Sequence, residues 1–244
     1  MAAINEKYLI AAFPLPMGLI LLPLIHTAGH DPGPRASAVA GWMLLLLVTQ
    51  SITAIMAGAL CRDFRGFCRA GIISGAAAMS AEALGCAAGL IPAGVILQTG
   101  AVFIGWGLFC TALASRIGSW SFSLTVPAGI TIAGMLIFSP ILFTPVFLAL
   151  QHSWPHWPWP AEILVNISPA IWMIDALATG IHYNWFIWFH APMMYQHVVL
   201  GQNTLMPRLW PWWMACAAAG VAGIIMAAAP RRTQGASCTD PDAR

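Results

Sequence analysis

Six apolar stretches, each long enough to cross a lipid bilayer as a helix, constrain the fold of this chain more than any other feature. A helical crossing takes about 20 residues, and the stretches cover residues 8–25, 39–60, 70–91, 94–115, 122–150 and 209–229. Lipid offers no hydrogen-bond partner to a free backbone group, and these stretches lack the alternating pattern of barrel strands. The sequence therefore predicts an all-α polytopic membrane protein with six transmembrane helices.

The composition excludes several other classes of protein. Hydrophobic residues make up 59% of the chain and charged residues 7%, whereas a soluble domain carries about 25% charged residues. The net charge of +2 comes without a basic cluster that could neutralise phosphates, so we expect no nucleic-acid partner. We predict one membrane domain over residues 1–230 and a polar, disordered cytoplasmic tail over residues 231–244. The first stretch could instead be a cleaved signal peptide, although its length and its three prolines are unusual for one.

The positive charges predict how the chain lies in the membrane. If the N-terminus is cytoplasmic, only Arg35 and Arg208 fall on the outer side. The other eight basic residues fall on the inner side: Lys7, Arg62, Arg65, Arg69, Arg116, Arg231, Arg232 and Arg244. Under the positive-inside rule, this bias predicts that both termini are cytoplasmic. The protein is then expected in the inner (cytoplasmic) membrane. We expect that membrane to be bacterial.

The segment between the fifth and sixth stretches, residues 151–208, has a different character. It begins with a proline-rich run that forbids a helix and continues with two apolar patterns too short for a crossing. Nine of the twelve tryptophans lie between Trp154 and Trp213, and tryptophan favours the headgroup level of a bilayer. We therefore predict short interfacial or re-entrant helices at the outer leaflet.

Glu82 is the one acidic residue well inside a predicted span. An ionisable group at that depth is costly, which favours a proton relay, a substrate contact or a partner for a buried cation. If the third helix begins later than predicted, Glu82 lies near the cytoplasmic surface as an ordinary charge at a helix end. Both interpretations stay open at this point.

Histidines and an aspartate in the outer segment are further candidates. His190 and His197 fall on one side of a plausible helix with two methionines between them, a pattern that could hold copper or haem. The alternative, which we favour, is that such histidines anchor an interfacial helix beside tryptophans, so we predict no metal site. Asp175 lies six residues into a helix that begins at Ser168-Pro169, where it faces an outer cavity or water.

Several catalytic signatures are missing from the sequence. It has no phosphate-binding loop of the Gly-x-x-x-x-Gly-Lys-Ser/Thr type, no His-Glu-x-x-His and no Gly-x-Ser-x-Gly. We therefore expect no enzymatic activity in this chain. Energy for any transport would have to come from another chain or from an ion gradient.

The layout resembles the membrane subunit of a type-2 ABC exporter, the ABC-2 permease family. Residues 166–177, Asn-Ile-Ser-Pro-Ala-Ile-Trp-Met-Ile-Asp-Ala-Leu, look like the segment after the fifth span of such permeases, and residues 109–116 look like the end of their fourth span. The resemblance implies six spans, short outer helices after the fifth, and an ATPase-docking connection after the second. It places the docking candidates at Arg62, Asp63, Phe64 and Arg65, and it makes Trp172, Asp175 and His190 candidates for an outer gate.

The same resemblance implies the partners of the chain. A separate soluble subunit would bind and hydrolyse ATP, and this chain would hold no cofactor of its own. A second permease copy in a homodimer, or a related permease, would complete the pathway for an unidentified substrate. Two other functions stay open. The tryptophan-rich outer segment also suggests a haem-handling or redox-linked membrane subunit, and the chain could serve as an accessory subunit of a larger membrane complex.

Overall fold

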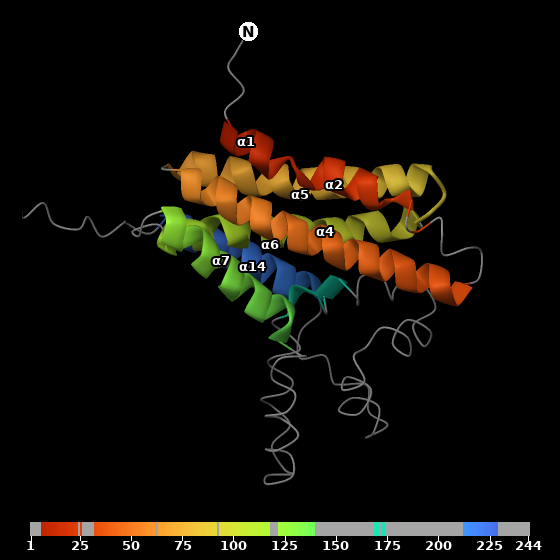
Figure 1. Cartoon of the computed structure of the whole chain (residues 1–244). Coiled ribbons are helices and arrows are strands. Elements are labelled where there is room, and N and C mark those ends of the chain that lie inside the picture. The colour runs from red at the N-terminus through yellow and green to blue at the C-terminus, as the bar shows by residue number, and fades with distance from the viewer. Residues whose placement is uncertain are drawn as a thin grey trace, which may run out of the picture.

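All the regular secondary structure among the described residues is helical. The computed structural model describes residues 6–23, 25, 32–61, 63–91, 93–117, 122–139, 168–170, 172–173 and 212–228. In chain order the elements are α1 (Glu6–Ala11), α2 (Pro14–Leu21), α4 (Pro32–Leu60), α5 (Phe64–Ala87), the 3₁₀ turn η1 (Ala93–Val95), α6 (Ile96–Ile117), α7 (Phe122–Ile137) and α14 (Trp212–Ala228) (Figure 1). No strand occurs among these residues, which confirms the all-α prediction for them.

Three of these helices are long and apolar enough to cross a membrane. They are the Gly41–Leu60 part of α4, all of α5 and all of α6. The apolar helices Phe122–Ile137 and Ala217–Met226 are shorter. The described residues are therefore compatible with a membrane protein, while the full set of six spans stays a prediction.

The first apolar stretch is not the single helix that the sequence led us to expect. It forms α1 and α2, which meet at a turn over Ala12 and Phe13. Pro14 explains the break, because a proline has no N–H for the helical bond and its ring clashes with the carbonyl of the residue four positions earlier. At the first position of α2 the same proline is well placed, since the N–H there has no helical partner.

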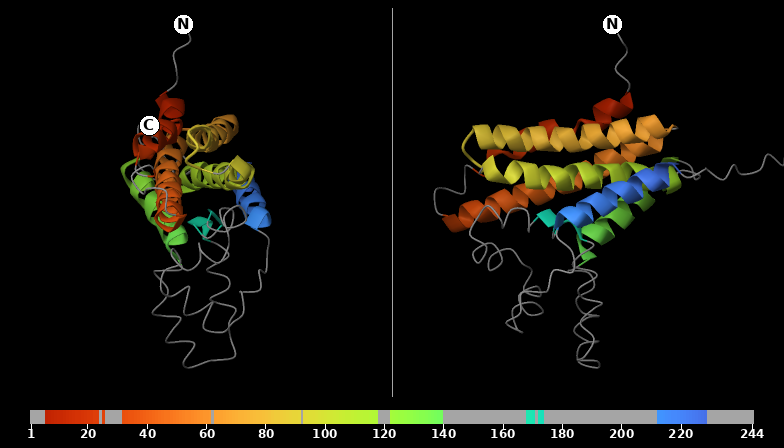
Figure 2. Two further views of the ribbon diagram at one scale, coloured as in Figure 1. Left: turned by 90° about the vertical axis from the view of Figure 1, so that its right-hand side faces the viewer. Right: turned by 180° about the vertical axis from the view of Figure 1, so that it is seen from behind.

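Helix α6 lies at the centre of the bundle and packs against α4, α5, α7 and α14 (Figures 1 and 2). Glycines let the backbones approach. A Cβ on Gly71 of α5 would lie 2.9 Å from the Cα of Leu108, and one on Gly75 would lie 2.8 Å from the Cα of Ile104. A Cβ on Gly223 of α14 would lie 2.8 Å from the carbonyl oxygen of Leu108. Such contacts are typical of closely packed membrane helices.

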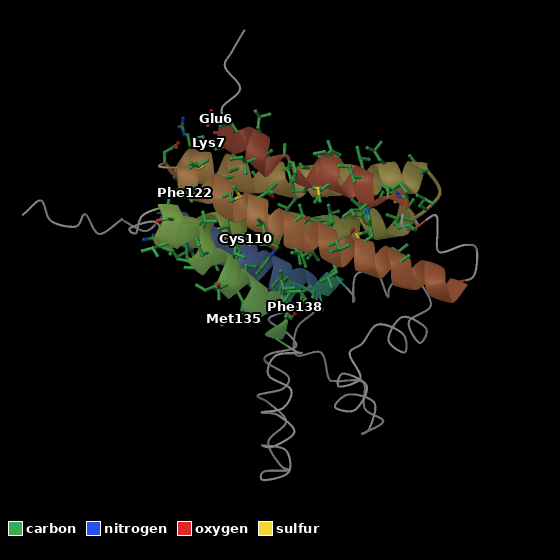
Figure 3. All side chains as sticks on the ribbon, in the orientation of Figure 1. Glu6, Lys7, Cys110, Phe122, Met135 and Phe138 are labelled. Atoms are coloured by element: carbon green, nitrogen blue, oxygen red, sulfur yellow. The ribbon has the colours of Figure 1, made fainter. Side chains whose placement is uncertain are left out.

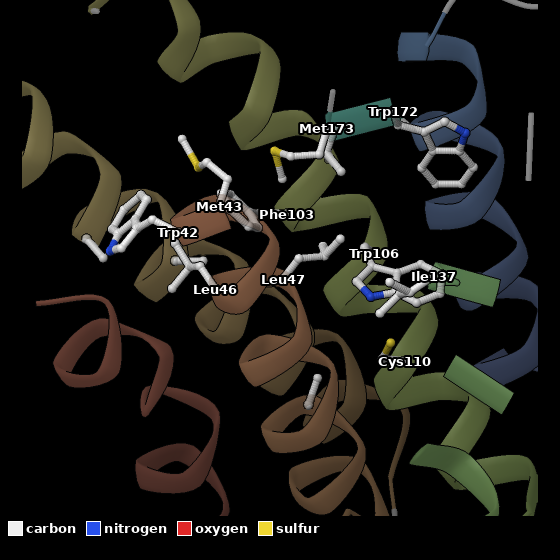
Figure 4. Close-up of a cluster of buried hydrophobic side chains, with 14 of the residues drawn as sticks. Trp42, Met43, Leu46, Leu47, Phe103, Trp106, Cys110, Ile137, Trp172 and Met173 are labelled. Carbon is white, nitrogen blue, oxygen red and sulfur yellow. The ribbon is translucent and has the colours of Figure 1, made fainter. Parts of the chain in front are cut away.

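Large buried side chains pack between the helices. Figure 4 shows Leu47 of α4 in a cluster with Phe103 and Trp106 of α6, and Trp42 and Leu46 on another side of α4; all five are buried. Trp42 and Leu46 lie against Gly18 of α2, and the Trp42 indole N–H donates a 3.0 Å hydrogen bond to the Gly18 carbonyl. Their burial holds α4 against both α2 and α6, because each large buried side chain contributes about 1.5 to 3 kcal/mol through apolar burial.

Helix α5 begins and ends with local signals that set its position. Asp63 precedes it with extended backbone angles, and its side chain accepts a 3.1 Å hydrogen bond from the Gly66 N–H, which caps the helix. At the other end Gly89 has a φ of 71°, and the Leu90 N–H bonds the Gly85 carbonyl at 3.0 Å, as in a Schellman motif. The helix therefore starts six residues before the apolar stretch that predicts it and ends four residues earlier.

The three long helices alternate in direction, so that the bundle has two distinct ends (Figure 1). The end of α4, the start of α5 and the end of α6 lie together, with the starts of α1 and α7 and the end of α14 beside them (Figures 1 and 2). We call this the charged end, defined by Lys7, Asp63, Arg65, Arg69 and Arg116. The opposite end contains the turn between α5 and α6 and is called the turn end.

Candidate functional site

The charged end gathers basic side chains from three helices. Lys7 comes from α1, Arg65 and Arg69 come from one face of α5, and Arg116 comes from the last turn of α6. Figure 3 labels Glu6 and Lys7 at this end. Arg65 and Arg69 are exposed, whereas Lys7 is partly buried. The residues that the sequence assigned to the inner side of the membrane thus meet on one surface, as far as the described ones are concerned.

Three of the four docking candidates can be placed. Phe64 is 45% exposed, Arg65 is exposed on the next position, and Arg62 lies outside the described residues. Asp63 serves as the cap of α5, a structural task that the sequence prediction missed. The signal was present in the sequence, because an aspartate just before a helical stretch is a typical N-cap.

Lys7 lies close to that cap. The site where a Cβ on Gly66 would lie is 2.7 Å from a carboxylate oxygen of Asp63 and 3.3 Å from the Lys7 Nζ. The ammonium group also lies 5.3 Å from the centroid of the Tyr8 ring. The absence of a side chain on Gly66 leaves room for the Lys7 and Asp63 side chains where the starts of α1 and α5 lie together.

The connection between α4 and α5 is very short. Helix α4 ends at Leu60 and α5 begins at Phe64, so only residues 61–63 join them. A connection of this length holds no separate docking helix. The surface available to a partner after the second predicted span is therefore the first turn of α5 itself, with Phe64 and Arg65 exposed on it.

Arg116 has a different environment from the two arginines of α5. Its Nε donates to the carbonyl oxygen of Met226 near the end of α14. A cation at the C-terminal end of a helix interacts favourably with the helix dipole and with the last carbonyl groups. Arg116 therefore joins α6 to α14 at the charged end and is partly buried there.

Glu82 lies far from the charged end. It is fully buried and comes eighteen positions after the first residue of α5 and five before the last, which places it about 27 Å along the helix axis from Phe64. The hydroxyl oxygen of Thr99, in the first turn of α6, lies 2.6 Å from one carboxyl oxygen of Glu82 and 2.7 Å from the other. The neighbouring residues seal this region, since a Cβ on Gly18 of α2 would touch Ala81 at 2.6 Å.

Other polar groups are buried in the middle of the bundle, and the sequence analysis did not single them out. Gln50 of α4 donates from its amide nitrogen to the Phe103 carbonyl. Its amide oxygen and the Ser74 hydroxyl have no hydrogen-bond partner among the described residues. The signal was again available, because a glutamine in the centre of the apolar stretch 39–60 needs a hydrogen-bond partner from a neighbouring helix.

Of the outer-gate candidates, the structure places Trp172. It is buried and meets Trp106 of α6 edge-on, with ring centroids 6.5 Å apart and an interplanar angle of 85° (Figure 4). The predicted helix start at Ser168-Pro169 is confirmed by the Trp172 N–H bond to the Ser168 carbonyl at 3.2 Å. The Ser168 hydroxyl donates to the Ile137 carbonyl of α7 at 2.8 Å. Asp175 and His190 lie outside the described residues, as do the tail 231–244 and most of the segment 151–208.

Two regions of the bundle, the charged end and the surroundings of Glu82, differ in the chemical groups that they present. The charged end presents cations and an exposed aromatic ring, which suit a protein surface or anionic headgroups. The Glu82–Thr99 pair presents a sealed carboxyl group. Within the described ranges, no three His, Cys, Asp or Glu residues gather closely enough to hold a metal ion.

Comparison of the chain with protein-family models, curated proteins and solved structures finds no match.

Proposed function

We propose that this protein is the permease subunit of an ABC-type exporter in a bacterial inner membrane. A separate soluble subunit hydrolyses ATP, and the charged end faces the cytoplasm. The observation that carries the proposal is the exposure of Phe64, Arg65 and Arg69 on one turn-and-a-half of α5 at that end. An aromatic anchor flanked by arginines is the combination that protein interfaces favour.

The packing of α5 supports a mechanical role for that surface. Its glycines hold its backbone against α6, and a Cβ on Gly58 of α4 would collide with the Thr111 backbone of α6. Close-packed helices move as a unit because their interfaces have no slack. A push by the ATPase on the first turn of α5 would thus shift α4, α5 and α6 together, as in rigid-body gating.

Exposed apolar faces on α7 and α14 are available for a second permease copy or for lipid. Exposed residues on them include Leu124, Met135, Val221 and Ile225. A homodimer built through such a face would enclose the pathway between two copies, and the substrate stays unidentified.

Association with an ATPase tests this proposal. The tagged protein is purified in mild detergent from the cell that makes it, and we expect a soluble chain with a phosphate-binding loop to accompany it. Arg65→Glu should reduce that association at least tenfold with membrane insertion unchanged, because it reverses the charge beside Phe64. Ala93→Glu introduces a charge at an exposed position of the turn end and serves as the matched control. Retention of the ATPase by Arg65→Glu, or its absence from the wild-type preparation, overturns the proposal.

A second candidate, the accessory subunit of a larger membrane complex, is favoured by the connection of residues 61–63. That connection is too short to form a docking element of its own. In this case the wild-type protein brings down other integral membrane chains and no ATP-binding subunit. The same purification therefore separates the two functions.

A further inference from the structure

The Glu82 carboxyl group is enclosed in the bundle with few polar neighbours. Its exposed fraction is 0%, and Thr99 supplies the hydrogen bonds that the structure shows for it. Burying an ionised carboxylate costs a large free energy unless several donors or a cation compensate. One hydroxyl group is little compensation for a full negative charge.

The basic side chains that the structure describes do not lie close enough to Glu82 to compensate a negative charge on its carboxylate. Four of them belong to the charged end: Lys7, Arg65, Arg69 and Arg116. The start of α5 at that end lies about 27 Å along the helix axis from Glu82. At the turn end, Arg35 lies in the first part of α4, and its side chain is outside the described ones. Cys86, one turn further along α5, is the nearest other titratable group on this helix, and the described parts of α2 and η1 carry none.

The hydrogen atoms of the pair can be counted. A threonine hydroxyl carries one hydrogen and can donate it to one acceptor. Among the described atoms, at least three acceptors lie within reach of it, namely the two carboxyl oxygens of Glu82 and the carbonyl oxygen of Ile96, 3.3 Å from the hydroxyl oxygen. A carboxylic acid resolves the competition, because its O–H donates to the Thr99 oxygen and leaves the Thr99 hydrogen for another acceptor.

A metal cation fits this site poorly. Calcium takes about six to eight oxygen ligands. The hydrogen bonds that the structure shows for Glu82 come from Thr99, and no three His, Cys, Asp or Glu residues gather there among the described ones. Two adjacent positions pack against apolar groups, since Ala81 lies against Gly18 and Gly85 lies against Ile91. A proton needs no such ligand set.

We propose that Glu82 and Thr99 form a proton-binding site inside the bundle, in which the carboxyl proton is held between Glu82 and the Thr99 oxygen. The site lies in the last third of α5, next to the turn into α6 and beneath α2. Separation of α2 from α5 would admit water to it and allow the proton to leave. The chain thereby has a group that can couple a movement at the turn end to a proton gradient. This inference rests on the described geometry alone and stands whether or not an ATPase binds the charged end.

Infrared spectroscopy of the purified protein in lipid nanodiscs tests the site. At neutral pH we expect the C=O stretching band of a protonated carboxylic acid, which shifts in deuterated water and is lost in Glu82→Gln. Thr99→Val should move this band to higher frequency because the acid loses its partner, whereas Thr99→Ser keeps the hydroxyl and should leave the band in place. A wild-type minus Glu82→Gln difference that contains only carboxylate bands overturns the proposal.

A chemical label tests the same claim in the unmodified protein, so the result does not depend on a variant that folds. A lipid-soluble carbodiimide reacts with buried carboxylic acids. The acid adds across one C=N bond, its proton passes to nitrogen, and the adduct rearranges to a stable N-acylurea without a leaving group. Mass spectrometry should find this adduct on Glu82, with a labelling rate that falls at least tenfold as the pH is raised. The absence of the adduct at low pH, or a rate that does not change with pH, contradicts the proposal.

Discussion

The indole N–H of Trp106 donates a 2.7 Å hydrogen bond to the hydroxyl oxygen of Ser51, and this bond joins α6 to α4 in the interior of the bundle. The Ser51 hydroxyl in turn donates to the Leu47 carbonyl at 2.8 Å. The Trp106 ring stacks on Phe109 with centroids 5.1 Å apart and meets Trp172 edge-on. One side chain thus connects α4, α6 and the short segment at residues 168–173.

Replacement of Trp106 by phenylalanine removes the hydrogen bond and keeps an aromatic ring. We expect the free energy of unfolding to fall by about 1 to 2 kcal/mol, because a buried hydrogen bond is lost. Ser51→Ala provides the second arm of a double-mutant cycle, measured by detergent-induced unfolding. The coupling energy should be about 1 kcal/mol, and strict additivity of the two changes would show that the bond contributes nothing.

Gly75 should tolerate no side chain. A Cβ at this position would lie 2.8 Å from the Cα of Ile104 and 3.0 Å from its backbone nitrogen, and neither backbone atom can move without shifting α6. We expect Gly75→Ala to cost about 1 to 3 kcal/mol of unfolding free energy.

The matched control for Gly75→Ala is Gly134→Ala in α7, where a Cβ would meet nothing within 4 Å. This change should be neutral or stabilise the helix by up to about 1 kcal/mol, because alanine has the higher helix propensity. Equal effects of the two substitutions on thermal unfolding would disprove the close approach of α5 and α6.

Asp63 has a role in capping that can be separated from docking. Asp63→Ala should reduce the free energy of unfolding by about 0.5 to 2 kcal/mol, because the Gly66 N–H loses its acceptor. Asp63→Asn removes the charge and keeps an acceptor oxygen, so its stability should stay within about 0.5 kcal/mol of wild type. If Asp63→Asn binds a partner ATPase as wild type does, the carboxylate charge is not part of the docking surface.

Arg116 should control the order of the last turn of α14. Replacement by methionine removes the donor to the Met226 carbonyl, and we expect faster hydrogen exchange over residues 222–228 with a local loss of about 1 kcal/mol. Arg116→Lys keeps the cation and should restore part of the protection. Unchanged exchange in Arg116→Met would mean that packing against α6 alone fixes this turn.

The helices that cover most of the apolar stretches could be predicted well, because the apolar residues that favour a membrane helix follow one another in the sequence. The stretches at 39–60, 70–91 and 94–115 lie mostly within α4, α5 and α6, since a chain in lipid must satisfy its backbone within each segment. Their ends were predicted less well. Hydropathy locates the apolar part of a helix, whereas Asp63 and Gly89 decide where α5 begins and ends, and Pro14 divides the first stretch.

The candidate site could be predicted only one residue at a time. An acid at position 82 in an apolar stretch was visible in the sequence, but its partner Thr99 lies on another helix, and no local pattern connects the two. The docking candidates were located by analogy with a family, which gave no indication that Asp63 would be occupied in capping α5. Long-range contacts of this kind depend on how the helices pack, and the glycines that determine the packing were recognisable only as a tendency towards close approach.

The side of the membrane that each end of the bundle faces is the most direct test of the account. In a variant whose six native cysteines are replaced, Arg65→Cys marks the charged end and Ala93→Cys marks the turn end, both at exposed positions. A membrane-impermeant maleimide should label position 93 in intact spheroplasts and label position 65 only after the membrane is broken. Labelling of position 65 from outside, or of both positions from the same side, would contradict a permease whose charged end receives a cytoplasmic ATPase.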